Sequence, residues 1–220
     1  MKTRPWFLTL SLLFLLPGFK RLYAQQDLIN GREYHRYTIF FAGGMPYFKT
    51  DSLTIGSIEF DEKKYEHIPL LYDQVMDEVV INNYDRSNFI RLVRPRVQRF
   101  SVLGSSFINL NRVDKKITDG YYEILHEGKI KLYKKDKKEI INDARIGQDV
   151  RKVIKSTVNY YLYKDGKYFN VRSVNSLISA LDDREEELKQ FAKKNKKKYR
   201  DTGTDIALAE VAAYYDQLTR

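Results

Sequence analysis

The chain has 220 residues, no cysteine, and 39 basic against 29 acidic residues, which gives a formal net charge of +10. The absence of cysteine excludes disulfides, cysteine-ligated zinc and thiol nucleophiles, so the fold must depend on an ordinary apolar core.

The first 24 residues have the three-part pattern of a secretory signal peptide. Lys2 and Arg4 form a positive end, an apolar run follows over residues 6–19, and the small residue Ala24 precedes Gln25. The run is shorter than the ~20 residues that span a bilayer as a helix. We expect cleavage after Ala24 and an exported protein, periplasmic or extracellular, that does not span the membrane. Without the signal, 35 basic residues face 29 acidic ones, so the basic excess is modest.

Residues 34–172 have the composition of short β-strands, with many β-branched and aromatic side chains. Strands are predicted within 34–41, 56–72, 76–81, 89–93, 97–110, 121–135 and 156–171. The longer ranges contain a turn, and 142–152 is expected to be a loop entering the next strand. Asp165-Gly166 favours a type I′ hairpin turn, because both central residues need positive φ.

About ten to twelve short strands joined by tight turns predict an antiparallel meander that forms a sandwich or an open barrel. Within residues 121–133, Ile124, Ile130 and Leu132 are expected to face inward while the intervening charged residues face water. We assign residues 25–173 to this β domain.

The hydrophobic period changes near residue 175. Leu177, Ile178 and Leu181 predict a short helix, and Asp182 or Asp183 is expected to cap a second helix that begins with three glutamates. Thr202 or Thr204 is expected to cap a third helix. Residues 174–220 are therefore predicted to form a helical unit packed on one side of the sheet.

The basic run at 193–200, KKNKKKYR, is interpreted as the solvated C-terminal end of the second helix, where cations complement the helix dipole. A second interpretation is an anionic-ligand patch for lipopolysaccharide, phospholipid or an acidic partner, made of Lys193, Lys194, Lys196, Lys197 and Lys198. Nucleic acid is disfavoured as a partner, because the run lacks interleaved aromatics and no nucleic-acid-binding motif accompanies it.

Several stretches resemble those of uncharacterised families of exported proteins from Gram-negative bacteria. They are GSIEFDEKKYEHIPLLYD with DEVVI, YYLYKDGKYFNVRS, and EEELKQFAKKNK leading to YYDQL, together with the signal peptide. The resemblance implies an envelope location, and it implies no catalytic residues.

Aromatic residues gather across one predicted hairpin, at Tyr161, Tyr163, Tyr168 and Phe169. Cross-strand aromatic pairs stabilise sheets, so core packing is the first interpretation. A surface for a glycan, a lipid or a partner protein is the second.

No catalytic or cofactor motif is present in the sequence. The three histidines, His35, His67 and His126, lack metal-ligand spacing, and Ser105-Ser106 lack a nucleophile elbow. We expect no cofactor, no metal and no enzyme activity. The predicted role is non-enzymatic binding at the cell envelope, to a protein, glycan or lipid. The alternatives are a carrier of an apolar ligand in a curved sheet and an unrecognised hydrolase.

Overall fold

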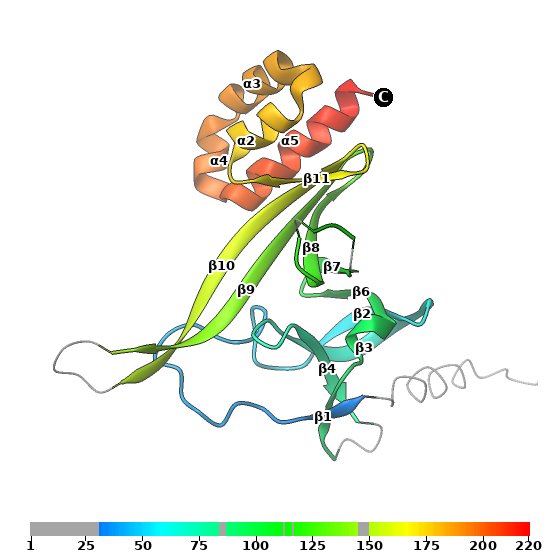
Figure 1. Cartoon of the computed structure of the whole chain (residues 1–220), viewed down its shortest axis with the longest axis vertical. Coiled ribbons are helices and arrows are strands. Elements are labelled where there is room, and N and C mark those ends of the chain that lie inside the picture. The colour runs from blue at the N-terminus through cyan, green and yellow to red at the C-terminus, as the bar shows by residue number, and fades with distance from the viewer. Residues whose placement is uncertain (1–30, 84–86, 112, 116, 145–149) are drawn as a thin grey trace, which may run out of the picture.

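A computed structural model describes residues 31–220 apart from 84–86, 112, 116 and 145–149. It shows a mainly antiparallel β-sheet followed by a C-terminal helical unit, which confirms the predicted fold class (Figure 1). The predicted signal peptide and its cleavage position at Ala24 lie outside the described residues. Within the described residues, no helix is long and apolar enough to cross a membrane.

Eleven strands form one sheet that does not close on itself. The order across the sheet is β1-β5-β4-β3-β2-β6-β7-β8-β9-β10-β11, so most neighbours are also consecutive in the chain. The strands are β1 (Arg32–Tyr34), β2 (Thr54–Phe60), β3 (Lys63–Asp73), β4 (Glu78–Asn82), β5 (Phe89–Arg91), β6 (Val97–Val102), β7 (Ser105–Leu110), β8 (Gly120–Glu127), β9 (Lys131–Asp143), β10 (Arg151–Lys164) and β11 (Lys167–Val171).

The tight turns are where the sequence was most informative. Asp165 and Gly166 have φ of 50° and 75°, as the type I′ prediction requires. The turns at Asp61-Glu62 and Leu103-Gly104 also have positive φ at both residues. Their twist matches that of the flanking strands, so these turns fix the register of three hairpins locally.

The strand predicted at 34–41 is wrong, because regular pairing ends at Tyr34 and the chain then crosses the molecule as an irregular segment. Its main chain is held at Gly43, whose carbonyl accepts from Ile154 N–H at 2.8 Å, and at Met45 and Tyr47, whose carbonyls accept from the Lys138 ammonium. Individual hydrogen bonds hold this segment in place of a strand ladder. The aromatic composition of 34–41 favours a strand, but it does not provide a neighbouring strand to pair with.

The loop expected over 142–152 is wrong at both ends of that range. β9 continues to Asp143 and β10 begins at Arg151, so the two strands pair continuously from Asp143↔Arg151 to Lys131↔Tyr163. They form a long hairpin that reaches from the helical unit to the irregular N-terminal segment (Figure 1).

The apolar core has separate parts along the sheet. One cluster fills the β2–β7 part with aliphatic and aromatic side chains, among them Phe60, Tyr72 and Phe100. A second lies between the helical unit and β9–β11, where Leu132 and Leu162 meet Leu188 and Leu208. The opposite face of the same strands carries a third cluster that is rich in tyrosine.

Ile124 and Leu132 lie on opposite faces of the sheet, contrary to the predicted inward-facing set. A bulge between Ile124 and His126 shifts the register of β8 against β9. Ile124 consequently packs with the tyrosine-rich cluster, whereas Leu132 packs with the helices. Both faces are covered here, so the expected wet face is absent from this part of the described sheet.

A buried polar cluster joins the β3–β4 turn to β8 and β9. The Lys135 ammonium lies 2.8 Å from Asp77 Oδ2 and donates to Tyr121 O at 3.0 Å. Tyr72 OH donates to Asp77 Oδ1 at 2.6 Å, and Arg94 lies 3.4 Å from Asp77 Oδ2. Burial lowers the pKa of Lys135, while the Asp77 carboxylate opposes that effect.

The helical unit consists of α2 (Val174–Ala180), a 3₁₀ turn at 182–184, α3 (Glu185–Lys194), α4 (Lys196–Thr202) and α5 (Thr204–Leu218). Ser173 caps α2 in a capping box with Ser176. The predicted caps of the later helices are wrong, since Arg184 and Gly203 occupy those positions without side-chain cap bonds.

Asp216 fastens α5 to the β8–β9 turn. Its carboxylate contacts His126 Nε2 at 2.8 Å and accepts from the main-chain N–H groups of Lys129 and Ile130, at 2.8 and 3.2 Å. A Cβ at Gly128 would lie 1.8 Å from Asp216 Oδ2 and 2.9 Å from His126 Nε2, so a larger residue at this turn would have to displace the Asp216–His126 contact. The helical unit is thereby tied to the sheet at the end of its last helix.

Candidate functional site

The basic run does not form one helix end, because Asn195 interrupts it. Asn195 ends α3 with its side-chain amide donating to Phe191 O at 2.9 Å, and α4 begins at Lys196. Lys193 and Lys194 therefore lie in the last turn of α3, as predicted. Lys196, Lys197 and Lys198 lie in the first turn of the next helix, where cations do not complement the dipole. The interpretation of the whole run as a helix end is thus wrong.

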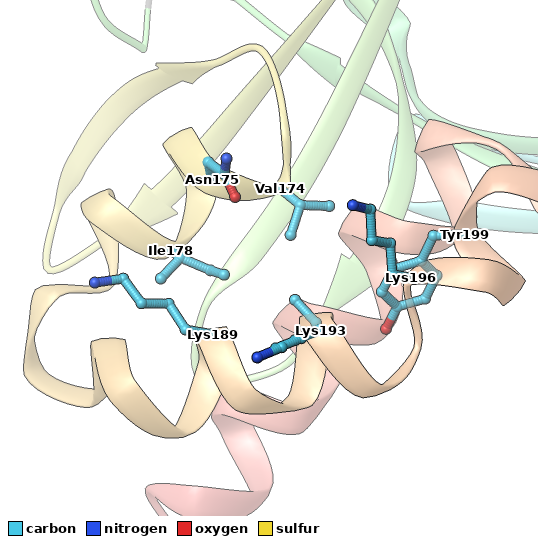
Figure 2. A pocket seen from close by; sticks show the side chains of 8 residues that line it. Val174, Asn175, Ile178, Lys189, Lys193, Lys196 and Tyr199 are labelled. Carbon is cyan, nitrogen blue, oxygen red and sulfur yellow. The ribbon is translucent and has the colours of Figure 1, made fainter.

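A surface hollow of about 380 Å³ lies where α2, α3 and α4 meet (Figure 2). We call it the helical hollow. It is lined by Val174, Asn175, Ile178, Lys189, Ala192, Lys193, Lys196 and Tyr199. In Figure 2 the apolar side chains of Val174 and Ile178 lie at its centre, and the lysines of α3 and α4 surround them. The arrangement combines an apolar floor with a cationic rim.

Four of the nine basic side chains of the helical unit form ion pairs: Arg184, Lys189, Lys198 and Arg200. Residues 174–220 contain nine basic and nine acidic residues, so the unit has no formal excess of either charge. Lys189 pairs with Glu185 at 2.9 Å and with Glu186 at 3.3 Å, which raises the pKa of Lys189. Lys198 pairs with Glu210 on α5. Lys198 is therefore separated from the other lysines of the predicted patch.

Four lysines of the helical unit form no ion pair within the described chain: Lys193, Lys194, Lys196 and Lys197. Together with Arg200 they line a second surface hollow of about 580 Å³, which shares Lys193 and Lys196 with the helical hollow. Only these two lysines border apolar side chains as well. The site is therefore best defined by Lys193, Lys196 and the apolar floor next to them.

Tyr199 contributes a neutral aromatic wall to the helical hollow. Burial raises the pKa of Tyr199 to about 12, and the Glu210 carboxylate contributes to that rise. The phenol consequently remains protonated at physiological pH. Its hydroxyl oxygen is buried, so the side chain offers a ring face, and it adds no negative charge that would oppose an anionic ligand.

The structure divides the predicted aromatic set between the two faces of the sheet. Tyr161, Tyr163 and Tyr168 belong to the tyrosine-rich cluster, with Tyr163 and Tyr168 rings 4.8 Å apart. Phe169 is opposite Leu162 in the β10–β11 register and so lies on the helix-facing side, 36% exposed. Tyr168 is buried, and Tyr161 and Tyr163 are half-buried, which favours packing as their main role.

The His126–Asp216 pair holds elements of the fold together and, within the described chain, does not form part of a catalytic arrangement with a hydroxyl group. His126 and Asp216 are in contact, but the carboxylate also accepts two main-chain N–H groups and joins two elements. Among the described residues, no serine or threonine hydroxyl bonds to His126, and no group of three or more histidine, aspartate or glutamate side chains is arranged to hold a metal ion.

Comparison with protein-family models, with curated proteins and with solved structures finds no match to this chain.

Sequence reasoning found the lysines of this site and missed its floor. Val174, Ile178 and Ala192 lie on α2 and α3, and in the sequence they are indistinguishable from ordinary core positions of amphipathic helices. Only the packing of α2 against α3 and α4 leaves part of these side chains at the bottom of an open hollow.

Proposed function

We propose that this protein is an exported, non-enzymatic binding protein of the cell envelope, and that its helical hollow binds an anionic amphiphile. The ligand class is an alkyl or acyl chain with a phosphate or carboxylate head. One observation supports this most directly: the unpaired Lys193 and Lys196 border an apolar floor, in a unit whose other rim cation, Lys189, is already neutralised.

The chemistry of the hollow fits both parts of such a ligand. Ammonium groups form charge-assisted hydrogen bonds with phosphate or carboxylate oxygens. Val174, Ala192 and the Tyr199 ring, above the buried Ile178, provide apolar surface for the first carbons of a chain. A free inorganic anion would use only the rim, and a neutral alkyl compound would use only the floor.

The alternative of a carrier with its ligand inside the curved sheet has less support. The space between the sheet and the helices is filled by fully buried side chains, including Leu132, Leu162, Leu188 and Leu208. A ligand there would have to displace a close-packed core, at a cost of several kcal/mol. The hydrolase alternative has less support again, since the His126–Asp216 pair is committed to holding α5 in place.

The direct test is calorimetric titration with decyl phosphate below its micelle concentration, compared with inorganic phosphate and decyl maltoside. Decyl phosphate should bind clearly more tightly than either control. Removing two partly exposed charge contacts costs about 1–2 kcal/mol, so Lys193→Gln with Lys196→Gln should weaken binding roughly 5- to 30-fold.

The matched control is Lys194→Gln with Lys197→Gln. It removes the same charge from the same two helices, but these lysines line only the second hollow. Ala192→Leu is the complementary variant, because it fills the floor and leaves the cations in place. It should weaken decyl phosphate binding and leave phosphate binding unchanged. Equal weakening by both lysine pairs would indicate non-specific attraction to a cationic surface and would refute the proposal.

A further inference from the structure

The outer edge of β10 is covered by two short segments with a gap between them. β10 pairs with β9 along Arg151–Tyr163 on one side. On its other side, β11 pairs with Tyr160–Lys164, and Gly43 bridges to Val153. Within the described chain, no strand pairs with the outer side of residues 155–159, which we call the open edge.

The main-chain direction along the open edge follows from its two ends. Ile154 N–H donates to Gly43 O, and Lys152 O accepts from Ala42 N–H, so the even-numbered residues of β10 direct their main-chain groups away from β9. The ladder with β9 has no bulge over this range. In a regular strand the same alternation continues, so Ser156 and Val158 each present one N–H and one C=O to the open side.

The open edge is accessible in the folded protein. Residues 155–158 are exposed, with Val158 at 42%. On either side of them the outer edge is covered, by the segment at Gly43 next to Lys152–Ile154 and by β11 next to Tyr160–Lys164. Figure 1 shows β10 along the outer side of the long β9–β10 hairpin, with β11 covering only the end near the helices. A segment of about five residues in extended conformation fits this gap, at ~3.3 Å per residue.

Side chains next to the gap indicate the character of that segment. On one face, the Lys155 ammonium forms no ion pair within the described chain, and the nearby Glu139 is already paired with Lys137 at 2.7 Å. On the other face, Val158 offers apolar surface. A strand with acidic side chains on one face and apolar side chains on the other complements both.

We propose that the open edge of β10 is a docking site for an extended, acidic peptide segment of a partner protein, bound by β-strand addition. The segment pairs its main chain with Ser156 and Val158, and it places a carboxylate near Lys155. This inference is independent of the helical hollow, which uses other elements and other lysines.

The test uses NMR titration with a capped seven-residue peptide of alternating glutamate and valine. Amide shifts should concentrate at residues 154–160. Methylating the peptide nitrogens that face β10 should weaken binding at least roughly tenfold, because main-chain hydrogen bonds are lost without a change of charge. Replacing glutamate by lysine in the peptide should also abolish most binding.

The matching protein variant is Val158→Pro. Proline removes the N–H of residue 158, which points away from β9. The hydrogen bonds between β9 and β10 do not use that N–H, so the circular dichroism spectrum should be preserved. Peptide binding should fall at least roughly tenfold. Thr157→Ala, whose main chain faces β9, is the control and should bind like the original protein.

Three results would overturn the proposal. The first is no binding at millimolar peptide, and the second is binding unaffected by N-methylation of the peptide. The third is a concentration-dependent dimer of the protein that Val158→Pro abolishes, since the gap would then be filled by a second copy of the chain. If Val158→Pro fails to fold, the N-methylated peptide still decides between main-chain pairing and charge attraction.

Discussion

The Asp77–Lys135 pair provides the most quantitative test of the fold. The two side chains are 16% and 11% exposed, and their charged atoms lie 2.8 Å apart. Lys135→Met keeps the length of the side chain and removes its charge. Asp77→Asn keeps the shape of the side chain, and asparagine tolerates the positive φ of 56° at this position.

Breaking a buried ion pair by removing one partner costs about 3–5 kcal/mol when the remaining charge has no other partner. Here Arg94 and Tyr72 still contact Asp77 after Lys135→Met, and Tyr121 O still accepts from Lys135 after Asp77→Asn. We therefore expect each single variant to lose about 2–3 kcal/mol of unfolding free energy. The double variant leaves neither charge alone, so its loss should be smaller than the sum by about 1–3 kcal/mol.

The assay is urea unfolding followed by far-ultraviolet circular dichroism, because Trp6 is the only tryptophan and lies within the predicted signal peptide. The slope of free energy against urea must be the same in all four proteins for the comparison to hold. Additive losses, equal within about 0.5 kcal/mol, would refute the reasoning that the two charges stabilise each other between the β3–β4 turn and β9.

Further predictions concern glycines, alkaline pH and processing. Gly128→Ala should destabilise the protein by about 2 kcal/mol or more, measured by urea unfolding, because its Cβ collides with Asp216; an unchanged midpoint would contradict the Asp216 contact. Gly166→Val should lower the unfolding free energy by about 1 kcal/mol or more, and Gly166→Asn by less. A Cβ at Gly166 meets no other atom, so the penalty comes only from the positive φ of 75°, which asparagine tolerates better than valine. Equal urea midpoints for the two variants would contradict a type I′ turn. Burial raises the pKa of Tyr122 from 10.0 to about 12 and also raises the pKa of Tyr133, so both phenols keep their protons to higher pH in the folded state than in the unfolded state. Their stabilising contribution is complete below pH 10 and is lost as the pH rises from 10 to 12. Circular dichroism against pH should show a steep loss of structure in that range, and unchanged stability up to pH 12 would contradict this expectation. N-terminal sequencing of the exported protein should begin at Gln25, and a mature form that retains Trp6 would disprove the predicted cleavage.

Local chemistry was sufficient where a few neighbouring residues decide the conformation. Asp165-Gly166 determines its turn because positive φ is inexpensive for glycine and tolerated by aspartate. The change of hydrophobic period at residue 175 likewise locates the start of the helical unit, and the spacing of Leu177, Ile178 and Leu181 identifies the side of α2 that is buried.

The candidate site was predictable only as a list of lysines. The sequence shows five lysines close together, and it does not show that Glu210, twelve residues after Lys198, neutralises one of them. It also does not show that Asn195 breaks the helix, because asparagine is compatible with a helix interior at a modest cost. The distinction between a solvated helix end and a hollow with an apolar floor depends on how α2, α3 and α4 pack.

The amino-acid sequence by itself determined the antiparallel class, the Asp165-Gly166 turn and the order of strands before helices, because alternation, turn residues and periodicity are properties of short segments. The tertiary structure alone decided which strands found neighbours and which faces were covered. Residues 35–41 have strand composition but belong to no strand of the described sheet. The bulge after Ile124 places Ile124 on the face opposite Leu132. The same long-range pairing leaves residues 155–159 of β10 open, since β11 ends at Val171 and the N-terminal segment reaches only as far as Ile154.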